Sequence, residues 1–291
     1  SANSTDQNPE WTFTEPGTYN VTLVVWNEAG SNSTTKFDYI TVTDEPSEYY
    51  IIDPATLPIV IDNDMVAAHG TKYKLGGDWT DINNTGAVMI TATAPEGICF
   101  NGDNHTLTGT GTINSGYSIF INQGSNVGVV FVKAQGWDAG IGLYSANNVY
   151  LEKNDLSNNH YEGIDIHESS DIVIGNNTLI DNGNNGILVA DSINVSCLRP
   201  SDLIPGYGPN FITGTGGGIW YNNVTGGTIQ GCELTGNGWG IGLTGSADIT
   251  IENNTISQNT GDSYNLGVGC GNSQNIVIQN NAISDNQNTS I

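Results

Sequence analysis

The chain has 291 residues, of which six are lysine or arginine and thirty are aspartate or glutamate, so its formal net charge is −24 at pH 7. This excess of negative charge repels nucleic acid and anionic lipid, which excludes both as partners. No run of apolar residues is long enough to cross a bilayer, so no membrane span is expected.

The first predicted element is a β-hairpin within residues 1–43. Polar and apolar residues alternate from Glu15 to Gly30, where a turn falls, and a second strand runs through Tyr39 to Val42. The Pro-Gly-Thr-Tyr start of the first strand and its Asn-x-x-Gly turn closely resemble the last two strands of a PKD domain. That resemblance implies a partial immunoglobulin-like domain of a kind common on archaeal cell surfaces. Residues 44–50, with Pro46 and two glutamates, are predicted to be a linker.

From Gly116 onward a four-residue sequence motif, of the type Gly140-Ile141-Gly142-Leu143, occurs seven times. We call it the first phrase of the repeat; by subtraction, its starts lie 22, 23, 23, 32, 22 and 25 residues apart. A period of about 20 to 25 residues built on short strands is typical of a solenoid. We expect seven coils over residues 116–291, with one aliphatic residue of each phrase in a single inward column. These residues are Ile119, Ile141, Ile164, Ile187, Ile219, Ile241 and Leu266.

A second short motif, such as Val149-Tyr150-Leu151, follows the first phrase in the coils. It contains two apolar residues separated by one residue, so both apolar side chains point to the same face of a strand. Three positions later stands an asparagine, at Asn154, Asn177, Asn254 and Asn281. Stacked coils would place these asparagines above one another. We expect an asparagine ladder at a bend where the backbone turns left-handed.

This repeat resembles the right-handed parallel β-helix family, which includes polysaccharide lyases, uronan epimerases and many surface proteins of methanogenic archaea. The resemblance implies an all-β fold, a right-handed parallel β-helix solenoid behind a small N-terminal hairpin. Residues 51–115, with Tyr73–Trp79 and Ile98–Leu107, look like the first coils of that family. An insertion at Arg199 to Gly208 lengthens one coil and is expected to form a loop on one face.

One segment, His160 to Glu168, concentrates ionisable side chains. It resembles the Tyr-Gly-Phe-Asp-Pro-His motif of alginate C5-epimerases, with an upstream lysine at Lys133. The resemblance implies that Asp165 and His167 act as acid/base groups at a sugar carbon and that Lys133 binds the carboxylate.

The match departs from the motif where Glu162 is inserted and where Ile166 replaces proline. The chain also lacks the basic trough that a polyuronate needs, and only bound calcium would relieve the repulsion. We favour the alternative in which the acid and the histidine lie on a polar outer face by chance. Purified protein is then expected not to convert or cleave uronate polymers.

Phe120 and Trp220 occupy outward positions of the first phrase, and Leu188 shares that column. Exposed aromatic residues on a flat sheet stack on sugar rings or form a protein interface, and the sequence leaves both alternatives open.

Four cysteines are present, and outside the cytosol oxidation is the default expectation. Cys197 and Cys232 lie near equivalent points of successive coils, about 4.8 Å apart, which a disulfide can bridge. The alternative is that each is a small buried hydrophobic residue. Cys99 and Cys270 are far apart in a linear solenoid, so we expect them, if oxidised, to pair with other molecules. No cysteine and histidine cluster favours a metal site.

Asn-x-Ser/Thr sequons suggest glycosylation, although an asparagine-rich chain contains several by chance. Two of them fall one residue before ladder asparagines, at a position expected to face solvent. The candidates are Asn20, Asn32, Asn83, Asn104, Asn176, Asn194, Asn223 and Asn253.

Together these features predict an extracellular structural or adhesive surface protein, a self-assembling subunit of an archaeal envelope layer, sheath or fibre. The sequence stops after the last ladder asparagine without a capping element, and an open strand edge recruits other strands. Its expected partners are therefore copies of itself and cell-surface glycans. The alternatives are a polysaccharide-active epimerase or lyase and a carbohydrate-binding β-helix without catalysis. No cofactor is expected, apart from the calcium considered above.

Overall fold

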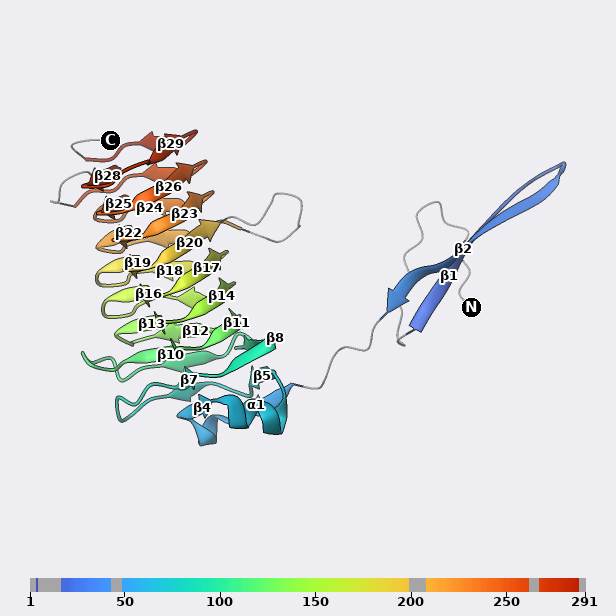
Figure 1. Ribbon diagram of the computed structural model, residues 1–291, viewed down its shortest axis with the longest axis horizontal. Helices are drawn as coiled ribbons and strands as arrows, with labels where there is room; N and C mark the ends of the chain where they lie inside the picture. The colour runs from blue at the N-terminus through green and yellow to red at the C-terminus, as the bar shows by residue number, and fades with distance from the viewer. Residues whose placement is uncertain (1–3, 5–16, 43–48, 199–207, 262–266, 288–291) are drawn as a thin grey trace. The chain divides into compact units, whose positions relative to one another are not determined.

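The structure is a computed structural model that describes Ser4 and residues 17–42, 49–198, 208–261 and 267–287 (Figure 1). The chain divides into two compact units, Ser1–Glu48 and Tyr49–Ile291. None of the helices in the described ranges is long and apolar enough to span a membrane.

The first unit contains the predicted hairpin. Strand β1 (Gly17–Asn27) pairs antiparallel with β2 (Gly30–Val42), and Asn27 faces Gly30 at the turn. Its apolar side chains are largely exposed, including Leu23 at 62% and Trp26 at 69%. Within the part of this unit that the structure describes, nothing covers them, as expected for part of a two-layer domain.

The second unit is a parallel β-helix whose coils stack one above another (Figure 1). Each complete coil contributes one strand to each of three sheets. The first sheet contains β4 (Ile59–Ile61), β7 (Val88–Ile90), β10 (Tyr117–Asn122), β13 (Ala139–Tyr144), β16 (Glu162–His167), β19 (Asn185–Ala190), β22 (Gly217–Asn222), β25 (Ile241–Thr244) and β28 (Val268–Gly271).

The second sheet contains β3 (Tyr50–Ile52), β5 (Lys72–Leu75), β8 (Thr93–Asn101), β11 (Ser125–Val130), β14 (Asn147–Glu152), β17 (Ser170–Gly175), β20 (Ile193–Leu198), β23 (Thr225–Gln230), β26 (Ala247–Glu252) and β29 (Val277–Gln279). The third sheet contains β6 (Trp79–Thr80), β9 (Thr106–Thr108), β12 (Lys133–Gln135), β15 (Asp155–Leu156), β18 (Thr178–Ile180), β21 (Phe211–Thr213), β24 (Glu233–Thr235), β27 (Thr255–Ser257) and β30 (Ala282–Ser284).

The early coils also carry a short 3-10 helix, η1 (Pro54–Thr56), and an α-helix, α1 (Asn63–His69). The Asp62 side chain caps α1 by accepting a hydrogen bond of 2.9 Å from the Met65 backbone N–H. The helix contacts β4 and β8, so these residues form the first coils, as the sequence predicted.

The inward column predicted from the repeat is confirmed for its first six members, which pair in register from Ile119 to Ile241 and are fully buried. Burying each such side chain contributes about 1.5 to 3 kcal/mol. The prediction that Leu266 is the last member of the column was wrong. Ile241 pairs with Val268, and Leu266 lies outside the described residues. A shift of two positions keeps the alternation of side chains, so the pattern alone did not fix the register.

The asparagine ladder is also confirmed. Asn154 Nδ2 donates to Asn177 Oδ1 at 3.0 Å, and Asn254 Nδ2 donates to Asn281 Oδ1 at 2.9 Å. Asn210 joins the ladder between Asn177 and Cys232, a member that the sequence reading missed. The left-handed residue is not the ladder asparagine, however, but the one before it, including Lys153, Asn176 and Asn253, each with φ of 56°.

A second ladder, which the sequence analysis did not identify, runs along the bend that follows the third sheet. Asn159 Nδ2 donates to Asn182 Oδ1 at 3.2 Å, and Asn259 Nδ2 donates to Asn286 Oδ1 at 2.8 Å. Asn237 continues it, and Thr215 occupies the ladder position in one coil. Both ladders satisfy buried amides that would otherwise be costly to remove from water.

The candidate disulfide between Cys197 and Cys232 is not formed in this structure, and the two residues do not occupy equivalent points of successive coils. Cys197 lies in β20 in register with Ile174 and Ile229, whereas Cys232 occupies the ladder position. Both thiols are free and fully buried, as in the alternative of small core residues. Burial raises the pKa of Cys197 to about 12, so it stays a neutral thiol. Cys99 is free and half-buried, and Cys270 is free and exposed.

Alkylation of the folded protein distinguishes the buried cysteines from the accessible ones. Iodoacetamide at neutral pH is expected to modify Cys270 rapidly and Cys99 more slowly, while Cys197 and Cys232 react only after unfolding, because attack requires an accessible thiolate. Peptide mass spectrometry with and without denaturant measures this. Rapid labelling of Cys197 in the native protein, or a Cys197–Cys232 disulfide peptide, would contradict this core.

Candidate functional site

The outward side chains of the first sheet form the candidate site, which we call the first-sheet face. Its central column runs in register through successive coils as Phe120, Gly142, Asp165, Leu188, Trp220 and Gly242. Two flanking columns contain Tyr117, Ala139 and Glu162 on one side and Asn122, Tyr144 and His167 on the other. The site is therefore built by strands β10, β13, β16, β19, β22 and β25.

Three side chains of this face are joined by hydrogen bonds. His167 Nε2 lies 2.8 Å from Asp165 Oδ1, and the Tyr117 hydroxyl donates to Asp165 Oδ2 at 3.0 Å. Asp165 is 13% exposed and His167 is 40% exposed, so the imidazole is accessible from solvent. A carboxylate that holds an imidazole on one oxygen and a phenol on the other is suited to proton transfer.

Tyr117 reaches Asp165 across a whole coil because the residue between them in the stack is Gly142. A Cβ at this position would collide with the Tyr117 ring, so the missing side chain leaves room for the ring to lie over the strand. Asp138 fixes the chain just before Tyr117. Its carboxylate accepts hydrogen bonds from the backbone N–H groups of Asn114 at 2.9 Å and Gly116 at 3.1 Å.

The electrostatics of the cluster follow from these contacts. The hydrogen bond that His167 donates to Asp165 raises the pKa of His167 above its usual value, and partial burial opposes that shift. Burial raises the pKa of Glu162, and the charge of Asp165 adds to the effect. The Glu162 carboxylate accepts hydrogen bonds from Asn184 Nδ2 at 2.6 Å and Asn185 Nδ2 at 3.3 Å. Burial beside Asp165 also raises the pKa of Tyr117, so its hydroxyl remains a donor.

An aromatic pair flanks this cluster on each side along the stack. Tyr117 and Phe120 stack with ring centroids 4.9 Å apart and an interplanar angle of 10°. Trp220 and Trp239 meet edge to face, with centroids 6.5 Å apart. Phe120 and Trp220, the two aromatic residues predicted to face outward, do lie on the outer face, but their partners leave them only half-buried rather than fully exposed.

Lys133 does not join Asp165 and His167. It lies in β12 of the third sheet, next to Thr106 and Asp155, whereas the acid and the histidine lie in the first sheet. The implied carboxylate-binding role of Lys133 therefore has no basis in this fold. Trp137, four residues after Lys133, is fully buried, and its Nε1 donates to the Leu107 carbonyl at 2.9 Å.

Tyr161, the tyrosine of the sequence motif, lies outside β16 and is 41% exposed. Tyr117, which the sequence analysis did not single out, supplies the hydroxyl instead. A tyrosine two coils before an aspartate, with glycine at the intervening outward position, was the only sequence signal for this contact.

The sequon asparagines are mostly accessible. Seven of the candidates, all except Asn176, are exposed. The amides of Asn194 and Asn223 donate to Asp171 and Asp191, both at 2.7 Å. Asn176 is half-buried and accepts a hydrogen bond from the Gly208 backbone, so the expectation that its position faces solvent is met by Asn253 and only partly by Asn176.

Metal binding stays untested as a prediction. Among the described residues, no group of three or more His, Cys, Asp or Glu side chains is arranged to hold a metal ion.

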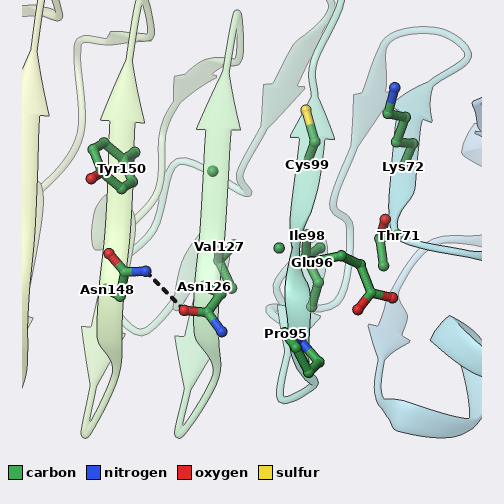
Figure 2. Close-up of a pocket in the computed structure, with 12 residues that line it drawn as sticks. Thr71, Lys72, Pro95, Glu96, Ile98, Cys99, Asn126, Val127, Asn148 and Tyr150 are labelled. Atoms are coloured by element: carbon green, nitrogen blue, oxygen red, sulfur yellow. Dashed lines mark hydrogen bonds between the residues drawn. The ribbon is translucent and has the colours of Figure 1, made fainter. Parts of the chain in front are cut away.

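Two grooves lie elsewhere, on the outer face of the second sheet. Figure 2 shows one of about 400 Å³, lined by Lys72, Glu96, Cys99, Asn126 and Tyr150 among others. Asn148 Nδ2 donates to Asn126 Oδ1 at 2.8 Å within it, and an adjoining groove shares Asn126, Asn148 and Tyr150. These grooves hold no hydrogen-bonded acid and histidine pair among the described residues, so we place the candidate site on the first-sheet face.

The Asp165–His167 contact can be tested by titration. In wild-type protein the NMR signals of His167 are expected to titrate above the ordinary histidine pKa of 6.5. Stability from the protonated pair is then fully present below pH 6.5 and is lost as the pH rises through the raised pKa. Asp165→Asn should lower the His167 pKa, because the partner that stabilises the charged imidazole loses its negative charge. A His167 pKa unaffected by Asp165→Asn would contradict the contact.

Comparison with known proteins places the fold within a family. A family model described as a right handed beta helix region matches residues 77–197 and 209–291, and a PKD domain model matches residues 1–42. None of the curated proteins matches the sequence.

Among solved structures, the mannuronan C-5 epimerase AlgE6 A-module of Azotobacter vinelandii is 17% identical, with 72% of this chain and 71% of that chain covered and a TM-score of 0.42. The catalytic domain of a GH87 alpha-1,3-glucanase is 13% identical, with 85% and 65% covered and a TM-score of 0.35. Such distant likeness says nothing about activity here. With more than half of its length matched by the family model, the chain belongs to the right-handed β-helix family.

Proposed function

We propose that this protein binds polysaccharide along the first-sheet face. The observation that carries the proposal is the arrangement of two aromatic pairs, Tyr117 with Phe120 and Trp220 with Trp239, around the polar cluster of Asp165 and His167. Aromatic faces with a few fixed polar groups between them are a common basis for recognising a ligand that presents both apolar and hydroxyl surfaces.

The spacing of the aromatic pairs suits an oligosaccharide that runs along the stack. Four steps of register separate Phe120 from Trp220, through Gly142, Asp165 and Leu188. At about 4.8 Å per strand the two side chains lie roughly 19 Å apart. The Tyr117 ring covers Gly142, so the surface between the aromatic pairs is made by Tyr117, Asp165 and Leu188, over a length that several sugar rings would span.

An extracellular, adhesive role is part of this proposal. It is supported by the net charge of −24, by the match to a PKD domain and by the exposed sequon residues. Self-association at an archaeal envelope stays a prediction. Mass in solution with and without reductant tests it, and a stable monomer under both conditions would contradict it.

Affinity electrophoresis and calorimetry with soluble polysaccharides test binding. Removing a central aromatic side chain with Phe120→Ala or Trp220→Ala is expected to cost about 2 kcal/mol or more, roughly a 30-fold loss of affinity. Tyr150→Ala is the matched control, since Tyr150 is 53% exposed on the second sheet. Equal losses in all three variants, or none, would contradict a site on the first-sheet face.

Catalysis on the bound polysaccharide is a second candidate function, favoured by the Asp165–His167 hydrogen bond and by the accessible imidazole. His167 would exchange a proton with the sugar. Asp165 would orient the imidazole and favour its protonated form, and the Tyr117 hydroxyl would donate a hydrogen bond to the second carboxylate oxygen of Asp165. Lys133 has no part in this arrangement, which therefore differs from the one that the sequence resemblance implied.

If catalysis occurs, Asp165→Asn and His167→Gln are each expected to lower turnover by about 10² to 10⁴ without abolishing binding. Release or conversion of sugars from the bound polysaccharide is measured, with Tyr150→Ala again as control. Unchanged turnover in both variants, or no turnover by the wild-type protein on any polysaccharide that it binds, would leave binding as the sole function.

A further inference from the structure

We infer that the polysaccharide bound at the first-sheet face is uncharged, and that the face rejects polyuronates. This inference rests on the proposed function and adds the chemical class of the ligand. It comes from the distribution of charge around Asp165 and from the way each carboxylate is already engaged.

Lysine and arginine side chains are absent from the first sheet in the ranges that the structure describes. The lysines of the β-helix lie in or beside the other two sheets, where Lys74 pairs with Asp103 at 2.8 Å and Lys153 lies 3.6 Å from Glu152. Lys72 lies beside Lys74 in β5, and Lys133 lies in the third sheet. Apart from the His167 imidazole, which already contacts Asp165, no described side chain on the first-sheet face can therefore pair with the carboxylate of a uronate.

Acidic side chains, in contrast, surround the middle of the face. Asp165 and Glu162 lie on β16, Glu168 follows that strand, and Asp191 follows β19 at the equivalent turn of the next coil. The charges of Asp165, Asp191 and Glu162 all act on His167. Even with His167 protonated, this region is negative and repels a polyanion, most strongly at low salt.

Each of these carboxylates already contacts a donor group of the protein, so fewer of its acceptor sites are left for a cationic sugar. Asp165 accepts from Tyr117 and contacts His167, and Glu162 accepts from two asparagine amides. Asp191 accepts from Asn223, and Glu168 lies close enough to the Tyr144 hydroxyl to raise its pKa. A ligand is left with aromatic faces, amides and hydroxyls, which suit neutral sugar rings.

The test compares three hexasaccharide series of equal length by calorimetry at low and physiological salt: uncharged glucose oligomers of several linkages, uronate oligomers and glucosamine oligomers. An uncharged series is expected to bind with a Kd that changes less than twofold with salt. The uronates should bind at least tenfold more weakly at low salt and recover as salt rises.

A charge variant makes the test specific. Glu168→Lys, at the edge of the face, is expected to strengthen uronate binding at least threefold at low salt. Glu96→Lys, an exposed change of the same charge on the second sheet, should not do so. Equal gains in both variants would mean that net charge alone governs uronate binding, which would overturn the inference.

Two further outcomes separate the inference from the proposed function. Tightest binding of uronates or glucosamine oligomers, lost in Phe120→Ala and Trp220→Ala, would overturn the inference but keep the site. Binding of no series, or binding that these two variants leave unchanged, would overturn both.

Discussion

Backbone pairing in register between successive coils is the constraint on which the rest of this structure depends. Each strand bonds to the equivalent strand of the next coil, so a residue at one position is stacked on its counterpart about 4.8 Å away. Ile141, for example, lies between Ile119 and Ile164. The same stacking repeats every property of a position, including shape, hydrogen bonding and charge. Inside the β-helix this repetition stabilises the fold, because aliphatic side chains pack on one another and asparagine amides form hydrogen bonds with one another.

On the outer face the same repetition would bring like charges together, and the sequence avoids this by varying the outward column. Asp165 stands between Gly142 and Leu188, so no second carboxylate is stacked on it. The aromatic residues Phe120 and Trp220 are likewise separated by smaller or polar residues. The candidate functional surface is therefore the outward column, where the residue type changes from coil to coil, whereas the inward columns of the core are nearly uniform.

The fold was predictable because its signal is an alternation repeated in every coil. An aliphatic residue followed three positions later by asparagine predicted the first ladder, and the same spacing from Leu156 to Asn159 and from Leu179 to Asn182 marks the second, so that ladder could have been found. The site was harder to predict. The contact between Tyr117 and Asp165 spans 48 residues and depends on register and on the empty space above Gly142. The motif instead suggested Lys133, which no alternation places on the same sheet.

Solenoid chains lengthen most easily by duplicating a coil, since a new coil finds matching partners on both sides. The bond between Tyr117 and Asp165 limits where that can happen. It joins residues two coils apart over one glycine, and an extra coil between β10 and β16 would separate the hydroxyl from the carboxylate by a further ~4.8 Å. The Tyr117–Asp165 hydrogen bond can therefore form only when β10 and β16 are two coils apart. The segment between β10 and β16 therefore has a fixed length, a limit that this hydrogen bond does not set for the coils elsewhere in the stack.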